Sequence, residues 1–317
     1  MTAFLDGISS LEYWRFCASA SNSASAVCRN NRYANETYSK AKISTTDIDT
    51  ISLALPKLSK PYHFLSAGPD LRTRSKQAQS RIAKASDIPP GSFIKIGKGL
   101  YACSPELCFC RLALLLDPIE LAKIGFELSG FYRKTADNGA IGNAPLTKQS
   151  KLAEFSERYS GSGCVKARKT APLVLDSSAS PMETSLALML TLAKSAGGFG
   201  LPRPRLNCKI SKGRASHHSV YGQAFYCDLY WPEAQVAIEY DSDSFHTASA
   251  KIEHDARRRN ALASLGITVI TATKNQVNNI DGLNQLASQT AKQLGVRLRL
   301  ERVNKQAQAQ LLRDALR

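Results

Sequence analysis

Three carboxylates are the residues best suited to do chemistry in this chain: Asp228, Glu239 and Asp241. They lie in the stretch YCDLYWPEAQVAIEYDSDSFH, where apolar side chains recur at every second position before and after Pro232. This period of two predicts two short strands joined by a tight turn. Glu239 and Asp241 are two residues apart, so they point to the same face of the second strand.

The register of this hairpin predicts that Asp228 and Glu239 meet. If residues 232–235 form the loop, Trp231 lies opposite Val236 and, counting back, Asp228 lies opposite Glu239. Like charges in such a pair, with Cβ atoms roughly 5 Å apart, repel each other. A divalent cation, a raised pKa or a nearby Arg or Lys must offset the repulsion. Clusters of oxygen ligands suit Mg²⁺ or Mn²⁺, ions that serve phosphate chemistry.

The segment after the hairpin, residues 248–265, predicts a helix with a mixed face. Lys251, Asp255, Arg258, Leu262 and Leu265 form one stripe at helical spacing. The two leucines should face the sheet, so the polar start of the stripe points toward the same layer. Two interpretations remain open: Lys251 and Arg258 stabilise negative charge at a reacting phosphate, or they form structural ion pairs with Asp255.

Two further residues are candidates for catalysis, each with a structural alternative. His246 ends the acidic stretch, where a neutral imidazole would accept a proton from an attacking water, although a lone loop histidine is more often a surface residue. Glu183 follows Ser180-Pro181-Met182, which predicts a helix start with a capping box. If that helix end packs toward the hairpin, Glu183 also holds a metal-bound water.

Composition favours a basic globular protein. The 317 residues are 43% hydrophobic, and the net charge is +16 with a pI of about 9.6. Such a charge favours a polyanionic partner, and nucleic acid is the partner expected here rather than a membrane. No apolar run approaches the ~20 residues that span a bilayer. The eight cysteines form no CxxC pair, which argues against a zinc site and indicates a reducing, cytoplasmic compartment.

Three regions are predicted along the chain. Residues 1–130 form a mixed α+β domain that includes strands at 61–66, 93–96 and 100–103 and a basic run that is either a solvated face or a phosphate-contacting surface. Residues 131–172, rich in Gly, Ser, Lys and Arg, are expected to be a partly mobile basic linker. Residues 173–317 form an α/β domain in which the strand at 267–273 is parallel to that at 236–241, because the helix between them makes a right-handed crossover.

The pattern of Asp228, Glu239-Tyr240-Asp241, His246, and then Asp255 and Arg258 before Gly266 and Val269 resembles the PD-(D/E)XK nuclease superfamily. The branch it resembles most is that of the very-short-patch-repair endonucleases, and the resemblance covers about residues 175–280. Residues 61–130 more weakly resemble the front half of abortive-infection or type IV toxin–antitoxin transcriptional regulators.

The resemblance implies a restriction-endonuclease-like domain with a central four-stranded mixed sheet flanked by helices. It implies that Asp228 binds a metal ion, that Glu239 or Asp241 completes its ligands, and that His246 activates water. The superfamily places a lysine two residues after Glu239, where this chain has Asp241, and Lys251 is the candidate replacement.

The expected function is therefore a magnesium- or manganese-dependent DNA endonuclease of repair or phage defence. The alternative is a catalytically silent DNA-binding regulator or antitoxin with the same fold, whose carboxylates are held by Arg258 and Lys251. A partner protein of a toxin–antitoxin or defence system is also expected.

Overall fold

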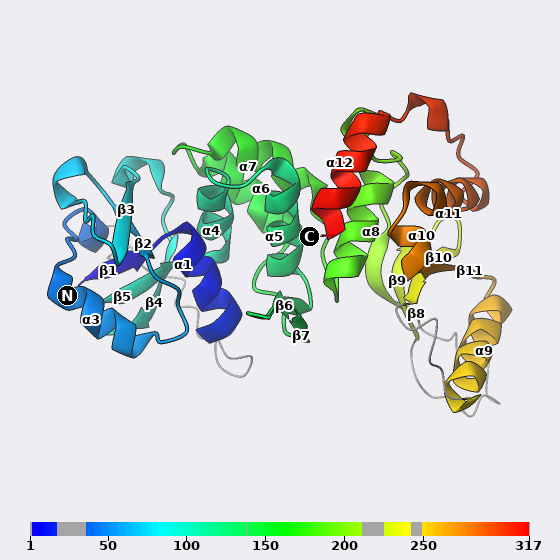
Figure 1. The fold of residues 1–317 in the computed structure, drawn as a ribbon, viewed down its shortest axis with the longest axis horizontal. Coiled ribbons are helices and arrows are strands. Elements are labelled where there is room, and N and C mark those ends of the chain that lie inside the picture. Colours follow the sequence, from blue (N-terminus) through cyan, green and yellow to red (C-terminus); the bar gives the residue numbers. More distant parts are fainter. Residues whose placement is uncertain (1, 18–35, 138, 211–224, 242–248, 317) are drawn as a thin grey trace. The chain divides into compact units, whose positions relative to one another are not determined.

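The computed structural model describes residues 2–17, 36–137, 139–210, 225–241 and 249–316, with the backbone alone for residues 45, 46 and 249–255. The chain divides into an N-terminal unit, residues 1–174, and a C-terminal unit, residues 175–317. Both units combine helices with a mixed sheet (Figure 1). Among the described residues, no helix is both long and apolar enough to cross a membrane.

The N-terminal unit is built on a five-stranded sheet with the order β3-β2-β1-β5-β4. Its central strand, β1 (Ala3–Leu5), is antiparallel to β2 (Tyr62–Ser66) and parallel to β5 (Leu100–Cys103). The edge strands are β3 (Ala78–Ile82) and β4 (Phe93–Gly97). The strands predicted at 61–66, 93–96 and 100–103 are confirmed, whereas β1 and β3 were not predicted.

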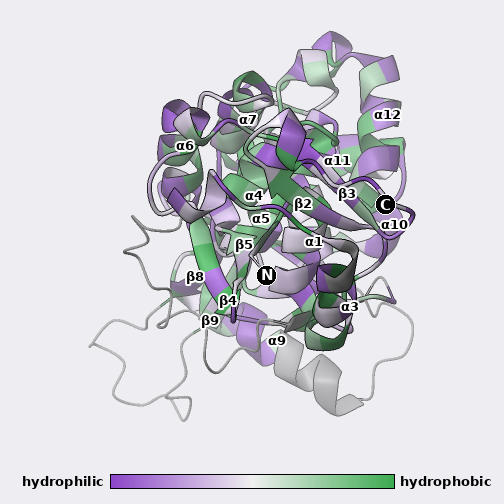
Figure 2. Ribbon diagram, turned by 90° about the vertical axis from the view of Figure 1, so that its left-hand side faces the viewer, coloured by the Kyte–Doolittle hydropathy of each residue, from purple (hydrophilic) through white to green (hydrophobic). Residues whose placement is uncertain are grey.

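Helices of the N-terminal unit begin at clear capping residues. Ser44 caps α3 (Thr45–Ala54), Ser104 caps α4 (Pro105–Leu112) and Asp117 caps α5 (Pro118–Ser129). Each cap side chain accepts a hydrogen bond from a backbone N–H of the first turn, which has no partner inside the helix. The first helix, α1 (Gly7–Glu12), continues into a π-helical turn at Tyr13–Cys17. Much of α4 and α5 is hydrophobic in Figure 2.

The prediction of a mobile linker at 131–172 is wrong. This segment folds within the N-terminal unit as the hairpin β6 (Tyr132–Lys134) and β7 (Ala140–Gly142), followed by α6 (Gln149–Arg158) and α7 (Cys164–Thr170). Leu152, Ser156 and Ala167 are buried. Tyr132 and Tyr159 are buried as well, so this segment adds large side chains to the core although few of its residues are apolar.

The C-terminal unit contains a four-stranded mixed sheet with the order β11-β10-β9-β8. The strands are β8 (Arg205–Ile210), β9 (Phe225–Trp231), β10 (Val236–Asp241) and β11 (Thr268–Thr273). β9 and β10 form the predicted hairpin, and Trp231 pairs with Val236 as the register required. β11 is parallel to β10, which confirms the predicted crossover.

Helices flank this sheet. α8 (Pro181–Thr191) packs against β9 and against α12 (Lys305–Leu316), while α9 (Ser249–Ser264) and α11 (Ile280–Gln293) contact β11 (Figure 1). The short α10 (Lys274–Val277) links β11 to α11. The structure confirms the prediction of a mixed sheet flanked by helices.

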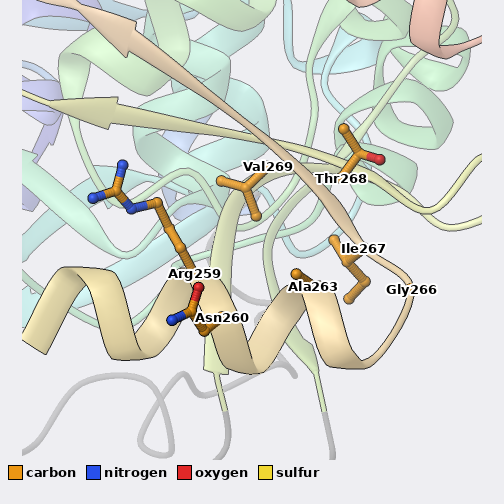
Figure 3. A pocket seen from close by; sticks show the side chains of 7 residues that line it. All are labelled: Arg259, Asn260, Ala263, Gly266, Ile267, Thr268 and Val269. Atoms are coloured by element: carbon orange, nitrogen blue, oxygen red, sulfur yellow. The ribbon is translucent and has the colours of Figure 1, made fainter.

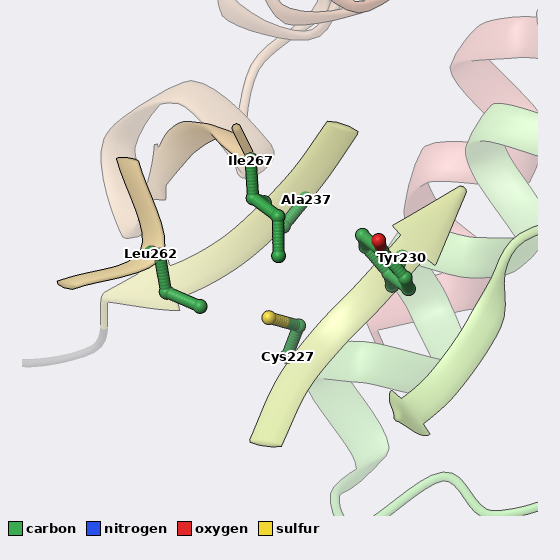
Figure 4. Close-up of a cluster of buried hydrophobic side chains, with 5 residues drawn as sticks. All are labelled: Cys227, Tyr230, Ala237, Leu262 and Ile267. Atoms are coloured by element: carbon green, nitrogen blue, oxygen red, sulfur yellow. The ribbon is translucent and has the colours of Figure 1, made fainter. Parts of the chain in front are cut away.

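The predicted apolar face of α9 is confirmed. Leu262 is fully buried and points from α9 toward Cys227, Ala237 and Ile267 (Figure 4). Leu265, also predicted to face the sheet, packs against the same cluster. Because α9 is anchored by this face, Arg258, one helical turn before Leu262, is carried toward the sheet as well.

Candidate functional site

Asp228 is fixed against β10 at the end of the hairpin ladder. The paired residues run from Trp231 and Val236 to Leu229 and Ile238, and Asp228 comes directly before the last of these pairs. The Oδ2 atom of Asp228 accepts a hydrogen bond of 2.8 Å from the backbone N–H of Tyr240. The carboxylate thus takes the place of a backbone partner directly beside Glu239.

Glu183 lies at the N-terminus of α8 and is only 8% exposed. Its backbone N–H donates to Ser180 Oγ, as the capping box predicted. The carboxylate, however, accepts from the N–H of Ala179 at 2.8 Å rather than from that of Ser180. This geometry leaves the side chain oriented toward the sheet, where it meets β8.

Asn207 connects Glu183 to the sheet. Its Nδ2 atom donates to Glu183 Oε2 at 2.6 Å and to the carbonyl of Ser177 at 2.9 Å. The backbone φ of Asn207 is 45°, a left-handed conformation that Asn tolerates better than most residues. Since Leu206 and Cys208 pair with Leu229 and Cys227, Asn207 lies across from Asp228. Sequence reasoning missed this residue, although an asparagine inside an otherwise strand-like run was a usable signal.

Burial raises the pKa of both Glu183 and Asp228. For Glu183 the pKa reaches about 7, because burial and the nearby Asp228 carboxylate outweigh the hydrogen bonds from Ala179, Asn207 and Ser180. For Asp228 burial also raises the pKa, against the Tyr240 N–H and the positive charge of Arg258, which lower it. Buried acidic groups whose pKa values are raised in this way are typical of functional sites.

Glu239 is held by Arg258 from α9. The guanidinium donates one hydrogen bond, from Nη1 to Oε2 at 3.1 Å, and its Nη2 atom lies 2.7 Å from Oε1 as an ion pair. The same Nη2 also donates to the backbone carbonyl of Tyr226. The acidic partner that the described residues give Arg258 is therefore Glu239, and the predicted pairing with Asp255 involves a side chain outside the described residues.

Of the remaining predicted site residues, the structure describes the side chain of Asp241. Asp241 ends β10 and pairs with Thr273 of β11. His246 lies outside the described residues, as does the side chain of Lys251. Within the described part of the chain, no three His, Cys, Asp or Glu side chains gather closely enough to hold a metal ion. The structure therefore brings together Asp228, Glu183 and Asn207, whereas Glu239 contacts Arg258 and the predicted trio of Asp228, Glu239 and Asp241 does not form.

The donor set fits a magnesium-type ion. Mg²⁺ keeps several waters and often binds only one or two carboxylates together with substrate phosphates. Asp228 and Glu183 are two such carboxylates, and burial raises the pKa of both. Asp228 Oδ1 accepts no hydrogen bond from the described residues. Glu183 accepts hydrogen bonds at both oxygens, and both oxygens of Glu239 contact Arg258.

A pocket elsewhere on α9 has different chemistry. It lies between α9 and β11 and contains no carboxylate (Figure 3). Its lining consists of Arg259, Asn260, Ala263, Gly266, Ile267, Thr268 and Val269. Arg259 is adjacent in sequence to Arg258 but lines this pocket, so the two arginines serve different surroundings.

Comparisons with known proteins give relatives without an assigned activity. The chain is 28% identical over 139 residues to the uncharacterized proteins Rv2248 and MT2308 from two strains of Mycobacterium tuberculosis. The match covers 44% of this chain, and it spans about half the length, 46%, of these curated relatives. No family model and no solved structure matches the chain.

Proposed function

We propose that this protein is a metal-dependent endonuclease that hydrolyses DNA phosphodiester bonds. The observation that carries the proposal is the buried pair of Glu183 and Asp228, joined through Asn207, in which burial and then the Asp228 charge raise the pKa of Glu183 to about 7. A group with such a pKa in a partly polar cluster is a candidate for chemistry rather than for stability. The four-stranded mixed sheet with flanking helices is consistent with the PD-(D/E)XK resemblance.

Asp228 and Glu183 are the residues that would hold the ion, and Mg²⁺ or Mn²⁺ would supply polarisation of the phosphate and a lowered pKa for an attacking water. Asn207 fixes the orientation of Glu183 through a 2.6 Å hydrogen bond, as outer partners of metal ligands commonly do. The Tyr240 N–H orients Asp228 in the same way. His246 remains the proposed proton acceptor.

The charge of the chain supports a nucleic-acid substrate. A net charge of +16 attracts a polyanion through salt-dependent phosphate contacts. In the basic run of the N-terminal unit, Arg74, Lys76 and Lys84 are exposed, whereas Arg81 lies 4.0 Å from the buried Asp6. We assign the exposed residues to phosphate contact and Arg81 to the structure of the unit. A cytoplasmic location and a partner protein of a defence system belong to the same proposal.

A second candidate function is favoured by the pairing of Glu239 with Arg258. With both oxygens of that carboxylate bound to a guanidinium, the site matches a nuclease fold used only to bind DNA, as a regulator or antitoxin does. The two candidates share the fold and the positive charge, and they differ in whether the acidic group performs hydrolysis.

Plasmid cleavage separates the two. Wild-type protein with Mg²⁺ or Mn²⁺ should convert supercoiled plasmid to nicked and linear forms on a gel. Asp228→Asn should lower this rate by at least ~10²-fold, the loss typical when a group that stabilises transition-state charge is removed. Asp281→Asn, an equal change of charge at an exposed position of α11, should cleave normally.

Gel shifts in EDTA complete the experiment. If neither wild type nor Asp228→Asn cleaves but both shift DNA, the protein is a binding regulator. If Asp228→Asn cleaves as fast as the wild type, the endonuclease site lies elsewhere and the proposal is wrong.

A further inference from the structure

Two cysteines of the C-terminal unit lie directly opposite each other in neighbouring strands. β8 and β9 are antiparallel, and Cys208 is paired with Cys227 in their register. Both thiols are free. Cys227 belongs to the buried cluster of Figure 4, and Cys208 packs against the same cluster, so the two side chains lie on one face of the sheet.

The spacing of opposed residues permits a bond between these sulfurs. In an antiparallel pair the Cα atoms of opposed residues are about 4.5–5.5 Å apart. Disulfides join cysteines whose Cα atoms are usually about 4.4–6.8 Å apart. The Cβ atoms of opposed residues are about 4.5–5.5 Å apart, and a disulfide brings them to about 3.5–4.5 Å. The two strands must therefore approach each other slightly, and a bond formed under such strain is easily reduced.

We propose that Cys208 and Cys227 are a redox modification site, at which a low-molecular-weight disulfide oxidises the two thiols to a reversible cross-strand disulfide. This inference goes beyond the proposed function and requires neither metal nor DNA. Disulfides of cytoplasmic proteins are usually transient and redox-sensing, and a strained bond suits that use.

The reaction proceeds by two thiol–disulfide exchanges. The thiolate of Cys208 attacks one sulfur of the reagent, the S–S bond of the reagent breaks, and one thiolate leaves. Cys227 then loses its proton, and its sulfur attacks the sulfur of Cys208, so the second thiolate leaves. Two protein thiols are oxidised, and one reagent disulfide is reduced to two thiols.

The surroundings of the two cysteines assign the order of these steps. Cys208 is partly exposed and can meet the reagent, whereas Cys227 is fully buried. Burial, followed by the charge of Glu239, raises the pKa of the Cys227 thiol to about 12. Cys227 is therefore inert toward an external reagent and reacts only with the sulfur opposite it.

The bond would join the strands beside the acidic group. Asn207, which donates to Glu183, directly precedes Cys208, and Asp228 directly follows Cys227. A disulfide here connects β8 to β9 and restricts the unfolded chain, so the oxidised C-terminal unit should unfold at a higher urea concentration than the reduced unit.

Peptide mapping of the full chain tests the bond. The protein is incubated with oxidised glutathione, its free thiols are alkylated, and it is digested with trypsin without reduction. Trypsin cleaves after Arg205 and Lys209, so Cys208 and Cys227 lie on different peptides. We expect a linked peptide with two hydrogen atoms fewer than its two parts together, and dithiothreitol should separate it.

Single variants show whether this pair is specific. Cys208→Ser and Cys227→Ala should each abolish the linked peptide. Cys164→Ser, which changes another partly exposed cysteine, should retain it. Because Cys103 and Cys108 are buried in the N-terminal unit, they should be alkylated only after unfolding.

Urea unfolding gives a second measurement. In a Trp14→Phe background, Trp231 fluorescence should show a higher midpoint after treatment with oxidised glutathione, and dithiothreitol should reverse the shift. The midpoint of Cys208→Ser should not respond. This comparison uses the partly exposed position and decides the question if Cys227→Ala does not fold.

The inference is overturned if folded wild-type protein carries only a glutathione adduct at Cys208 and no linked peptide. It is also overturned if Cys208 becomes linked to a cysteine other than Cys227. Either result leaves the proposed hydrolysis untouched, because metal binding and cleavage by the reduced protein depend on Asp228. Conversely, loss of the cleavage proposal would leave the linked peptide unaffected.

Discussion

Both units of the molecule contain arginines that contact both oxygens of a carboxylate, and the Arg111–Asp6 and Arg258–Glu239 pairs have different surroundings. In the N-terminal unit, Arg111 of α4 binds Asp6 through Nε at 2.9 Å and Nη2 at 3.1 Å, and both side chains are 1% exposed. In the C-terminal unit, Arg258 binds Glu239, with exposures of 29% and 17%.

The neighbours of each pair indicate its role. Arg111 also donates to the hydroxyl of Tyr159 at 3.2 Å, and the nearby Asp6 keeps the pKa of Arg111 above its ordinary value despite burial. This pair is closed off from solvent. The Arg258 pair instead borders Asp228, whose pKa burial raises, and Glu183 lies beyond Asp228. A buried ion pair of this kind has a structural role. A partly exposed ion pair beside acids with raised pKa values can exchange its partner.

The largest effect expected from this comparison is on the sealed pair. Arg111→Met should lower the free energy of unfolding of the N-terminal unit by about 3–5 kcal/mol, because Asp6 is left buried without a partner. Urea unfolding followed by Trp14 fluorescence in a Trp231→Phe background reports on this unit alone, since the chain has two tryptophans.

The matched control is Arg158→Met, which removes an exposed ion pair with Glu154, where the side chains are 53% and 70% exposed. Its effect should stay below about 1 kcal/mol. Equal losses from both variants would show that burial does not separate structural pairs from exchangeable ones, and the comparison would fail.

A smaller effect is expected from pH on the acidic group. The pKa of Glu183 rises from 4.5 to about 7 on folding, so the folded state binds its proton more tightly than the unfolded state. In EDTA the C-terminal unit should therefore lose up to about 3 kcal/mol of stability as pH rises from about 4.5 to about 7. The raised pKa of Asp228 acts in the same direction.

Glu183→Gln should remove most of this slope, and Glu233→Gln should leave it intact. Urea unfolding of a Trp14→Phe background, read from Trp231, measures the C-terminal unit across the pH range. If the free energy of unfolding of Glu183→Gln depends on pH as strongly as that of the wild type, burial does not raise the pKa of this carboxyl group. The contrast with the Arg111–Asp6 pair would then be wrong.

Sequence patterns predicted the parts of the site whose structure is determined by residues close together in the sequence. The alternation around Pro232 and the four-residue loop sufficed for the register of Trp231 with Val236. Helical spacing predicted that Leu262 is buried, and the cap at Ser180 predicted the start of α8. The mixed sheet followed from the handedness of the crossover.

The features that sequence reasoning missed depend on contacts between distant segments. The central strand β1 has three residues, too few for a periodic pattern, and it is defined by its neighbours β2 and β5. Asn207 reaches Glu183 across 24 positions, and Arg258 reaches Glu239 across 19. Spacing placed Arg258 on the right face of its helix but did not choose between Asp255 and Glu239 as its partner.

The central claim, that the acidic pair binds a divalent cation, is tested most directly by titrating Mn²⁺ into the wild-type chain and into Asp228→Asn by calorimetry, with Asp281→Asn alongside. We predict saturable binding to the wild type and to Asp281→Asn, and an affinity at least ~10-fold lower in Asp228→Asn, as expected when a metal site loses a carboxylate. Equal affinity in Asp228→Asn, or no binding to the wild type, would contradict the account.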